Sequence, residues 1–203
     1  MTVRLLPCGR SAVLVELDDV LGFQAALTRL PVDGVEELVP AARTLLVRFD
    51  PAVTDADRLG AVLREVSPVD GAVAASAEVV VPVVYDGEDL ADVAAEAALS
   101  VAELVSRHSK GSYVSAFCGF APGFAYLSGL DPALHVSRRS TPRTRIPAGS
   151  VAIAGEYSAI YPSASPGGWR LLGRTDVPVW DVERDPPNLL PPGTRVRFEA
   201  VGP

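Results

Sequence analysis

Apolar and polar positions alternate through residues 3–66 in a way that favours short strands and one-faced helices. Period-two apolar runs predict strands, and apolar residues at helical spacing predict helices. The expected elements are four strands, at 3–7, 12–17, 35–40 and 44–49, and two helices, at 20–30 and about 54–66. This ββαββα order predicts a small α+β domain with its helices on one face of an antiparallel sheet.

Helix-start signals support both predicted helices. Asp18 and Asp19 precede the first helix and can cap it, whereas Thr54 and Asp57 resemble a capping box for the second. The stretch 67–76 is rich in turn-forming and small residues, so we expect a domain boundary there. We therefore predict a small α+β domain at residues 1–77 and a second domain at residues 78–203.

The second half begins with an apolar strand and two helices. Residues 78–84 predict the strand, residues 86–99 an acidic helix, and Ser100 with Glu103 a capping box for a helix that ends near residue 108. Glycine and proline then recur every few residues between aromatic and β-branched residues, a pattern typical of a small barrel or sandwich. Further strands are expected at 113–120, 150–155, 158–162, 170–175 and 194–201.

Composition narrows the class of protein. Hydrophobic residues make up 48% of the chain and charged residues 21%, so a packed core is easily supplied. The net charge of −7 argues against general nucleic-acid binding. No apolar run has membrane-spanning length and no signal peptide is recognisable, so a cytoplasmic protein is expected. Cys8 and Cys118 are expected to be buried free thiols, and the chain shows no metal motif.

Four arginines lie within eight residues of the mildly basic second half: Arg138, Arg139, Arg143 and Arg145. Guanidinium groups repel one another and fill a barrel poorly, but their fork matches a carboxylate or a phosphate. The alternative is a solvated loop, or pairing with acids such as Asp131 and Glu156.

Two Gly/Pro-rich segments and one histidine complete the candidate site. The first segment supplies Gly119, Phe120, Pro122, Gly123, Phe124 and Tyr126, and the second supplies Pro166, Gly167, Gly168 and Trp169. They can shape a ligand pocket, or they can only form turns and fill the barrel. The second segment lacks the Lys-Ser/Thr of a phosphate-binding loop. His108 is a candidate proton-transfer residue, or a cation that suits a helix end.

Eight motifs occur in an order that resembles one family, allophanate hydrolase subunit 1, also called the KipI family or the family of 5-oxoprolinase B subunits. They are Y-D-G-x-D-L at 85–90, A-E-L-V-S-R-H at 102–108, G-F-A-P-G-F-A-Y-L at 119–127, R-R-x-x-P-R at 138–143, P-A-G-S-V-A-I-A-G at 147–155, I-Y-P at 160–162, S-P-G-G-W-R-L-L-G-R-T at 165–175 and P-G-T-R-V-R-F at 192–198. The resemblance covers nearly the whole chain, and it favours Arg139 and Arg143 as the anion-binding candidates among the four arginines.

The resemblance implies an α+β N-terminal domain followed by a cyclophilin-like β-barrel domain. It implies one component of an ATP-dependent 5-oxoprolinase that converts 5-oxo-L-proline to L-glutamate, with ATP and Mg²⁺ bound together with a partner. Its partners would be homologues of the A and C subunits of 5-oxoprolinase, and the chain alone would be inactive. The family also includes inhibitors of sensor histidine kinases and parts of urea or allophanate carboxylase–hydrolase systems, and these alternatives stay open.

The chain departs from the family pattern at one place. Where the family usually has Gln-Thr-Gly, this sequence has Tyr157-Ser158-Ala159. The glutamine amide and the glycine are both lost, which changes the available hydrogen bonds and the closest backbone approach. A pocket at this position is therefore expected to differ in specificity.

Overall fold

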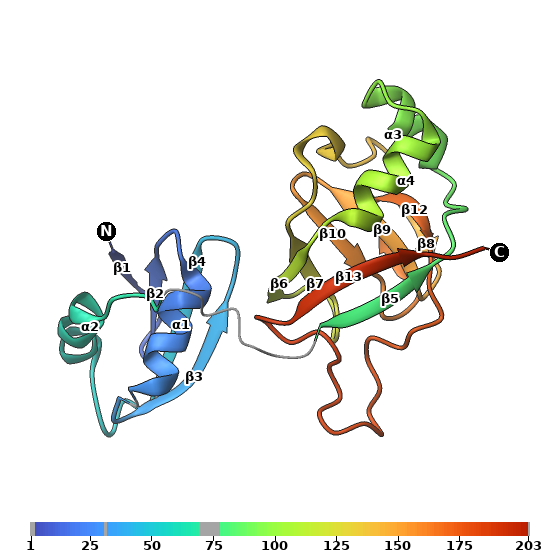
Figure 1. The fold of residues 1–203 in the computed structure, drawn as a ribbon. Coiled ribbons are helices and arrows are strands. Elements are labelled where there is room, and N and C mark those ends of the chain that lie inside the picture. Colours follow the sequence, from blue (N-terminus) through green and yellow to red (C-terminus); the bar gives the residue numbers. More distant parts are fainter. Residues whose placement is uncertain (1–2, 31, 70–77, 203) are drawn as a thin grey trace. The chain divides into compact units, whose positions relative to one another are not determined.

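The computed structural model describes residues 3–30, 32–69 and 78–202, and it divides the chain into two compact units, residues 1–74 and 75–203. Figure 1 shows both units along the chain. The predicted boundary between residues 77 and 78 adjoins residues 70–77, which lie outside the described residues. Each unit is therefore treated by itself.

The first unit is a four-stranded antiparallel sheet with two helices. Its strand order is β1-β2-β4-β3. The elements are β1 (Arg4–Pro7), β2 (Ala12–Glu16), α1 (Val20–Arg29), β3 (Val35–Pro40), β4 (Thr44–Phe49) and α2 (Ala56–Glu65). Alternate residues of the central strands, such as Val15 and Val47, pack in one core with Phe23 of α1 and Leu63 of α2. Both helices therefore cover the same face of the sheet.

The two helix starts differ from each other in how well the sequence predicted them. Asp19 caps α1, accepting a hydrogen bond from the Gly22 N–H at 2.9 Å. The predicted capping box of Thr54 and Asp57 is wrong. Asp55 is the N-cap of α2 instead, and its carboxylate accepts from the next turn's N–H groups. Thr54 and Asp55 are both good N-cap residues, so the sequence alone did not show which of the two caps α2.

The second unit is built on a seven-stranded sheet of order β12-β9-β10-β7-β6-β13-β5. Only the β13–β5 pair is parallel. Backbone hydrogen bonds between Val84 and Arg174, both 2.9 Å, join the two ends of the sheet and close it into a barrel. This closure confirms the predicted barrel. The elements are β5 (Val79–Val83), α3 (Leu90–Glu96), α4 (Val101–Lys110), β6 (Tyr113–Cys118), β7 (Ala125–Ser128), a 3-10 turn (Pro132–Leu134), β8 (Arg143–Ile146), β9 (Ser150–Ala154), β10 (Tyr157–Ile160), β11 (Ser165–Gly167), β12 (Arg170–Arg174) and β13 (Arg195–Ala200).

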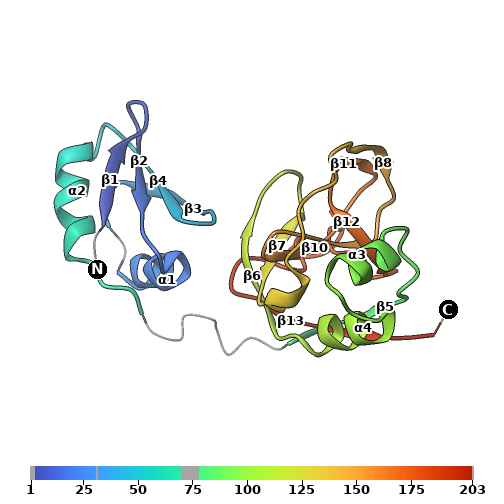
Figure 2. The ribbon, with the colours of Figure 1, turned by 90° about the horizontal axis from the view of Figure 1, so that it is seen from above.

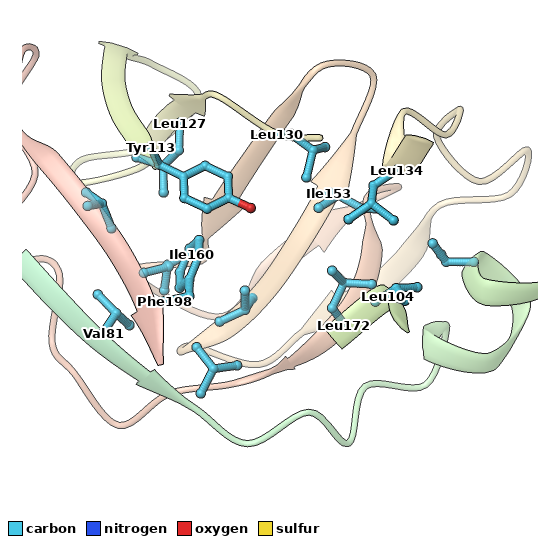
Figure 3. Close-up of a cluster of buried hydrophobic side chains, with 14 of the residues drawn as sticks. Val81, Leu104, Tyr113, Leu127, Leu130, Leu134, Ile153, Ile160, Leu172 and Phe198 are labelled. Atoms are coloured by element: carbon cyan, nitrogen blue, oxygen red, sulfur yellow. The ribbon is translucent and has the colours of Figure 1, made fainter. Parts of the chain in front are cut away.

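The barrel wall separates two apolar cores. Figure 3 shows the interior core, where Tyr113, Phe198, Ile153 and other labelled side chains meet inside the sheet. Along β9 the side chains alternate, so Ile153 points inward while Ala152 joins a second cluster with Trp169. The β8–β11 pair, separate from the main sheet in Figure 2, helps cover this outer cluster. The wall therefore carries a packed site on its outer face as well.

Several sequence expectations for this unit need correction. The Ser100–Glu103 capping box is confirmed. The helix predicted at 86–99 is wrong in its length, because α3 begins only at Leu90 and ends at Glu96. Strands β7, β8 and β11 were not predicted, because β8 is rich in arginine, β11 contains proline and glycine, and β7 is a four-residue strand directly after a Gly/Pro-rich turn. Cys8 is exposed and Cys118 half-buried, so the expectation that both are buried is wrong, although both are free thiols.

No helix in the described part of the chain combines the length and apolar character needed to cross a membrane.

Candidate functional site

A pocket of about 80 Å³ lies on the outer face of the barrel wall, where the three segments singled out in the sequence meet. Its lining comes from the 119–126 turn, the arginine segment, the 165–169 loop and one residue that follows β10. The lining residues are Phe120, Phe124, Tyr126, Arg138, Tyr161, Gly167, Gly168 and Trp169. The expected assembly of these segments is therefore what the structure shows.

Aromatic rings form most of this pocket, and they meet edge to face. Phe124 is fully buried, and its ring centroid lies 5.2 Å from Tyr126 and from Tyr161 and 5.5 Å from Trp169. Interplanar angles of 65–87° put ring edges against ring faces, the arrangement that aromatic pairs prefer. The floor is consequently rigid and apolar.

The turn between β6 and β7 presents an exposed aromatic ring in an unfavourable backbone conformation. Phe120 has φ of +70° and is 62% exposed. Hydrogen bonds from Gly119 N–H to Phe124 O, 3.1 Å, and from Phe124 N–H to Ala121 O, 3.0 Å, hold it. A left-handed conformation costs an aromatic residue roughly 1–3 kcal/mol, and such residues concentrate at functional sites. Phe120 therefore lies at the pocket rim, with its ring already held in an exposed position by the turn.

Arg138 provides the positive charge of the pocket. Its guanidinium carbon lies 5.9 Å from the Trp169 ring centroid, within cation–π distance. Among the described residues no carboxylate lies within ion-pair distance of this side chain, and the residue is exposed. Its hydrogen-bond donors are therefore available to an anion that enters the pocket.

Arg139 and Arg143, the arginines favoured from sequence, instead bind a buried carboxylate within the chain. Asp89 is 1% exposed and accepts from Arg139 Nη1 at 2.7 Å and from Arg143 Nη1 and Nη2 at 2.8 and 2.9 Å. Arg143 also binds Glu88 through Nε and Nη2 at 3.2 and 3.0 Å. Neither arginine lines the pocket, and their partners are not the acids expected from the sequence, Asp131 and Glu156.

The charge state of this cluster follows from its hydrogen bonds. Burial alone would raise the pKa of Asp89. Hydrogen bonds from Arg143, from the Leu171 N–H and from Arg139 outweigh burial, so the pKa of Asp89 is lowered. The same contact with Asp89 raises the pKa of Arg143. The cluster is thus a fixed set of opposite charges.

The profile of the carboxyltransferase domain family, subdomains C and D, matches residues 3–190. The chain is 39% identical to the 5-oxoprolinase B subunit of Escherichia coli O157:H7, over 94% of this chain and 92% of that protein. The chain belongs to this family.

Two solved structures relate the fold to longer chains. The crystal structure of TTHA0988 has a TM-score of 0.81 and 37% identity, covering all of this chain but only 41% of TTHA0988. The urea amidolyase of Kluyveromyces lactis has a TM-score of 0.73 at 21% identity, covering 98% of this chain and 15% of that protein. This family fold is therefore also found as one part of larger polypeptides.

His108, the predicted proton-transfer residue, lies inside the barrel and away from the pocket. It is fully buried, stacked 4.6 Å from the Phe198 ring. Ser158 Oγ, 3.0 Å from His108 Nε2, donates to Ala152 O and so accepts the Nε2 proton, while Nδ1 accepts from the Tyr85 hydroxyl at 2.7 Å. Burial lowers the pKa of His108 to about 3. A neutral, fully bonded imidazole cannot exchange protons with a ligand in the pocket.

Other predicted site residues support the pocket without lining it. Gly123, with φ of +78°, lies against Trp180, and Gly119 anchors the turn by its N–H. Pro122 completes the same turn, and Pro166 is exposed on β11. None of these four residues contributes to the pocket lining.

The departure from the family pattern lies in β10, beside the pocket. Ser158 points inward to His108 and takes no part in the lining. Tyr157 points outward, where its ring lies 5.7 Å from Tyr126, a lining residue. Burial raises the pKa of Tyr157 to about 12. The substitution therefore acts on the pocket through the position of Tyr126.

Two residues of the site were missed in the sequence. Tyr161 stood in the I-Y-P motif and Asp89 in the Y-D-G-x-D-L motif, but neither was assigned a site role. A buried aspartate that bonds residues 50 and 54 positions away leaves no local pattern. The only available signal was a carboxylate in a family motif followed by clustered arginines.

Proposed function

We propose that this chain is the B subunit of an ATP-dependent 5-oxoprolinase complex, which opens the lactam of 5-oxo-L-proline to L-glutamate. The main observation behind this proposal is the 39% identity to a protein of that name over nearly the full length of both chains. The pocket supports it, since it joins an aromatic wall to one available guanidinium group. This chemistry suits a small ring that bears a carboxylate.

In this proposal Arg138 binds the substrate carboxylate and the rings enclose the lactam. Phe124 and Trp169 are buried and hold one edge of the ring, while Tyr126 and Tyr161 place polar groups beside the apolar lining. Fixed placement of the lactam lowers the entropic cost of reaction, and exclusion of water strengthens the field of the arginine. The chain's part is to bind and orient the substrate.

The partners proposed are homologues of the A and C subunits of 5-oxoprolinase. A pocket of about 80 Å³ is well below the roughly 300–1,000 Å³ of typical small-molecule sites. Exposed Phe120 at its rim offers an apolar contact for a second protein surface. This chain covers only 41% of the longer TTHA0988 chain, where the same fold is joined to additional polypeptide. That arrangement supports a chain that acts together with other protein parts. The C-type partner would complete the site, and the isolated chain would be inactive.

We propose that ATP and Mg²⁺ are bound together with the partner proteins, because Mg²⁺ is usually held by one or two carboxylates and the phosphates of the nucleotide. No group of three or more potential metal ligands occurs among the described residues. The Ser165–Gly168 segment, the Gly-rich candidate of the sequence, lacks the lysine that phosphate-binding loops place on the phosphates. We therefore assign nucleotide binding to the partner proteins and derive no step through it here.

Two alternatives follow from the family. The fold of K. lactis urea amidolyase is shared, which keeps a urea or allophanate carboxylase–hydrolase system as a second candidate. Inhibition of a sensor histidine kinase is the third. Urea and allophanate lack the saturated ring for which the aromatic wall is suited, so the pocket favours 5-oxoproline.

Reconstitution tests the proposal. The chain is assayed for ATP-dependent glutamate formation from 5-oxoproline, alone and with the A and C partners, and in parallel with urea and with a sensor kinase. We expect turnover of 5-oxoproline only when all three proteins are present. Turnover by the isolated chain, or kinase inhibition with no lactam opening in any combination, would contradict the proposal.

A further inference from the structure

We propose that Asp89 sets the charge of the pocket. By binding Arg139 and Arg143 it leaves Arg138 as the available guanidinium, so that the site favours a singly charged carboxylate over a doubly charged anion. Asp89 is thus a specificity-determining and positioning residue that acts through the arginines. This inference rests on the proposed role of the pocket as a carboxylate site.

The position of Asp89 is fixed by the backbone around it. Its carboxylate accepts from the Leu171 N–H at 2.8 Å, and its own N–H donates to Leu171 O at 3.1 Å. Two residues earlier, Gly87 approaches β12 so closely that a Cβ there would lie 2.4 Å from Leu171 O. Only glycine permits this contact. The carboxylate is consequently held against β12, two residues beyond Trp169.

The arginines bound by Asp89 are linked through the backbone to residues that line the pocket. The Arg139 N–H donates to Gly168 O at 2.7 Å, and Gly168 lines the pocket next to Trp169. Arg143 begins β8, which pairs with β11 at Gly167, another lining residue. Asp89 therefore connects the loop that precedes α3 to Arg139 and Arg143, which follow Arg138 in the same segment.

The arginines and carboxylates around Asp89 carry one more positive charge than negative charges. Three guanidinium groups, of Arg138, Arg139 and Arg143, lie in this region, and its two carboxylates, of Asp89 and Glu88, pair with Arg139 and Arg143 only. Glu88 is 74% exposed and binds only the outer edge of Arg143, so it is the weaker partner. The buried Asp89 is the carboxylate that neutralises this cluster most firmly.

The field of the cluster reaches the pocket. Burial raises the pKa of the pocket residue Tyr161, while Arg138 and Arg143 both act to lower it. A change in the charge around Arg143 will therefore be felt by a ligand beside Tyr161. One additional positive charge attracts a dianion more than a monoanion, because the Coulomb energy is proportional to the ligand charge.

Anion binding by the full-length chain tests this inference. In a Trp180→Phe background, Trp169 is the remaining tryptophan and reports on its own pocket. The probes are 5-oxoproline as the monoanion and sulfate as the dianion, titrated at equal ionic strength. The variants are Asp89→Asn and Glu88→Gln, with Asp131→Asn as the control. Asp131 pairs with Arg107 at 2.9 Å, so its loss removes the same charge from another ion pair of this unit.

We expect Asp89→Asn to raise the affinity for sulfate relative to 5-oxoproline at least about fivefold, because one additional ligand charge has an effect of that size even at a separation on the order of 15 Å and an effective dielectric constant near 20. Glu88→Gln should shift the ratio in the same direction by less, and it keeps the test valid if Asp89→Asn does not fold. The inference is overturned if neither variant shifts the ratio relative to Asp131→Asn. The proposed function fails separately, through absence of 5-oxoproline turnover by the reconstituted complex.

Discussion

His108 shows how burial decides the protonation state of a single residue. Its ring lies among apolar side chains, and the two hydroxyl groups at its nitrogens stabilise the neutral form. The pKa of the folded state, about 3, lies below the ordinary value of 6.5. Protons therefore bind the unfolded chain first as the pH falls, and folding loses free energy between these two values.

This linkage predicts a slope of stability with pH. The free energy of unfolding of the second unit should fall by up to about 1.4 kcal/mol per pH unit between about pH 6 and 4. His108→Gln should reduce the slope, because glutamine can bond both hydroxyls without titrating. Urea unfolding followed by tryptophan fluorescence measures it, since Trp169 and Trp180 both lie in this unit.

His135 supplies the matched control for this measurement. It is exposed, and its Nε2 lies 3.1 Å from Leu130 O. His135→Gln replaces an exposed imidazole without touching the barrel interior, so the wild-type slope should persist. Equal slopes in wild type and His108→Gln would show that His108 does not couple folding to pH.

At the scale of elements, the 119–124 turn depends on one glycine for its position. Gly123 and Gly155 both have positive φ, at +78° and +56°. A Cβ at Gly123 would lie 2.5 Å from Trp180 Cβ, whereas a Cβ at Gly155 meets nothing within 4 Å. The two glycines therefore separate the cost of backbone strain from the cost of steric overlap.

This comparison predicts different losses of stability. Gly155→Ala should destabilise the second unit by roughly 1–2 kcal/mol, the cost of a left-handed alanine. Gly123→Ala should cost about 1–3 kcal/mol more, because Trp180 must move. The free energy of unfolding in urea measures both. Equal losses would mean that the Gly123–Trp180 approach does not hold the turn.

The sequence predicted best those elements whose local pattern decides the structure. The capping box of α4 is visible in Ser100 and Glu103, and it forms as expected. By contrast β8 reads Arg-Thr-Arg-Ile with a single buried residue, and β11 reads Ser-Pro-Gly. These two strands pair with each other, and Ile146 of β8 packs in the outer apolar cluster of the barrel wall. Such tertiary pairing leaves no periodic signal.

The same difference between local pattern and tertiary contact explains which parts of the site could be predicted. Dense glycine, proline and aromatic residues predicted that the turn and the loop would form a pocket, since such turns need local sequence. Which arginine faces the ligand depends on Asp89, more than 45 residues away along the chain. His108 was wrong as a proton-transfer candidate for a similar reason, because the packing of α4 against β13, and not a local pattern, places its ring in the barrel interior.

At the scale of the whole molecule, the chain divides into two compact units with separate cores. Limited proteolysis should first cut between about residues 67 and 90, because a boundary between separate cores has few contacts to protect it. Mass spectrometry of the early fragments locates the cut. First cuts inside the barrel, with residues 67–90 intact, would contradict two independent units.

The central claim is that the outer pocket of the barrel binds the substrate of a multisubunit enzyme. The most direct measurement is kcat/KM for glutamate formation from 5-oxoproline by the complex with the A and C partners, carrying Arg138→Ala or Arg145→Ala. Arg145 is an exposed arginine of β8 outside the pocket lining, which makes it the matched control.

Loss of a hydrogen bond to a charged group typically costs about 1.5–3 kcal/mol, so Arg138→Ala should lower kcat/KM on the order of 10–100-fold. Arg145→Ala should stay close to the wild-type value. Wild-type kcat/KM in Arg138→Ala, or equal losses in both variants, would contradict the account.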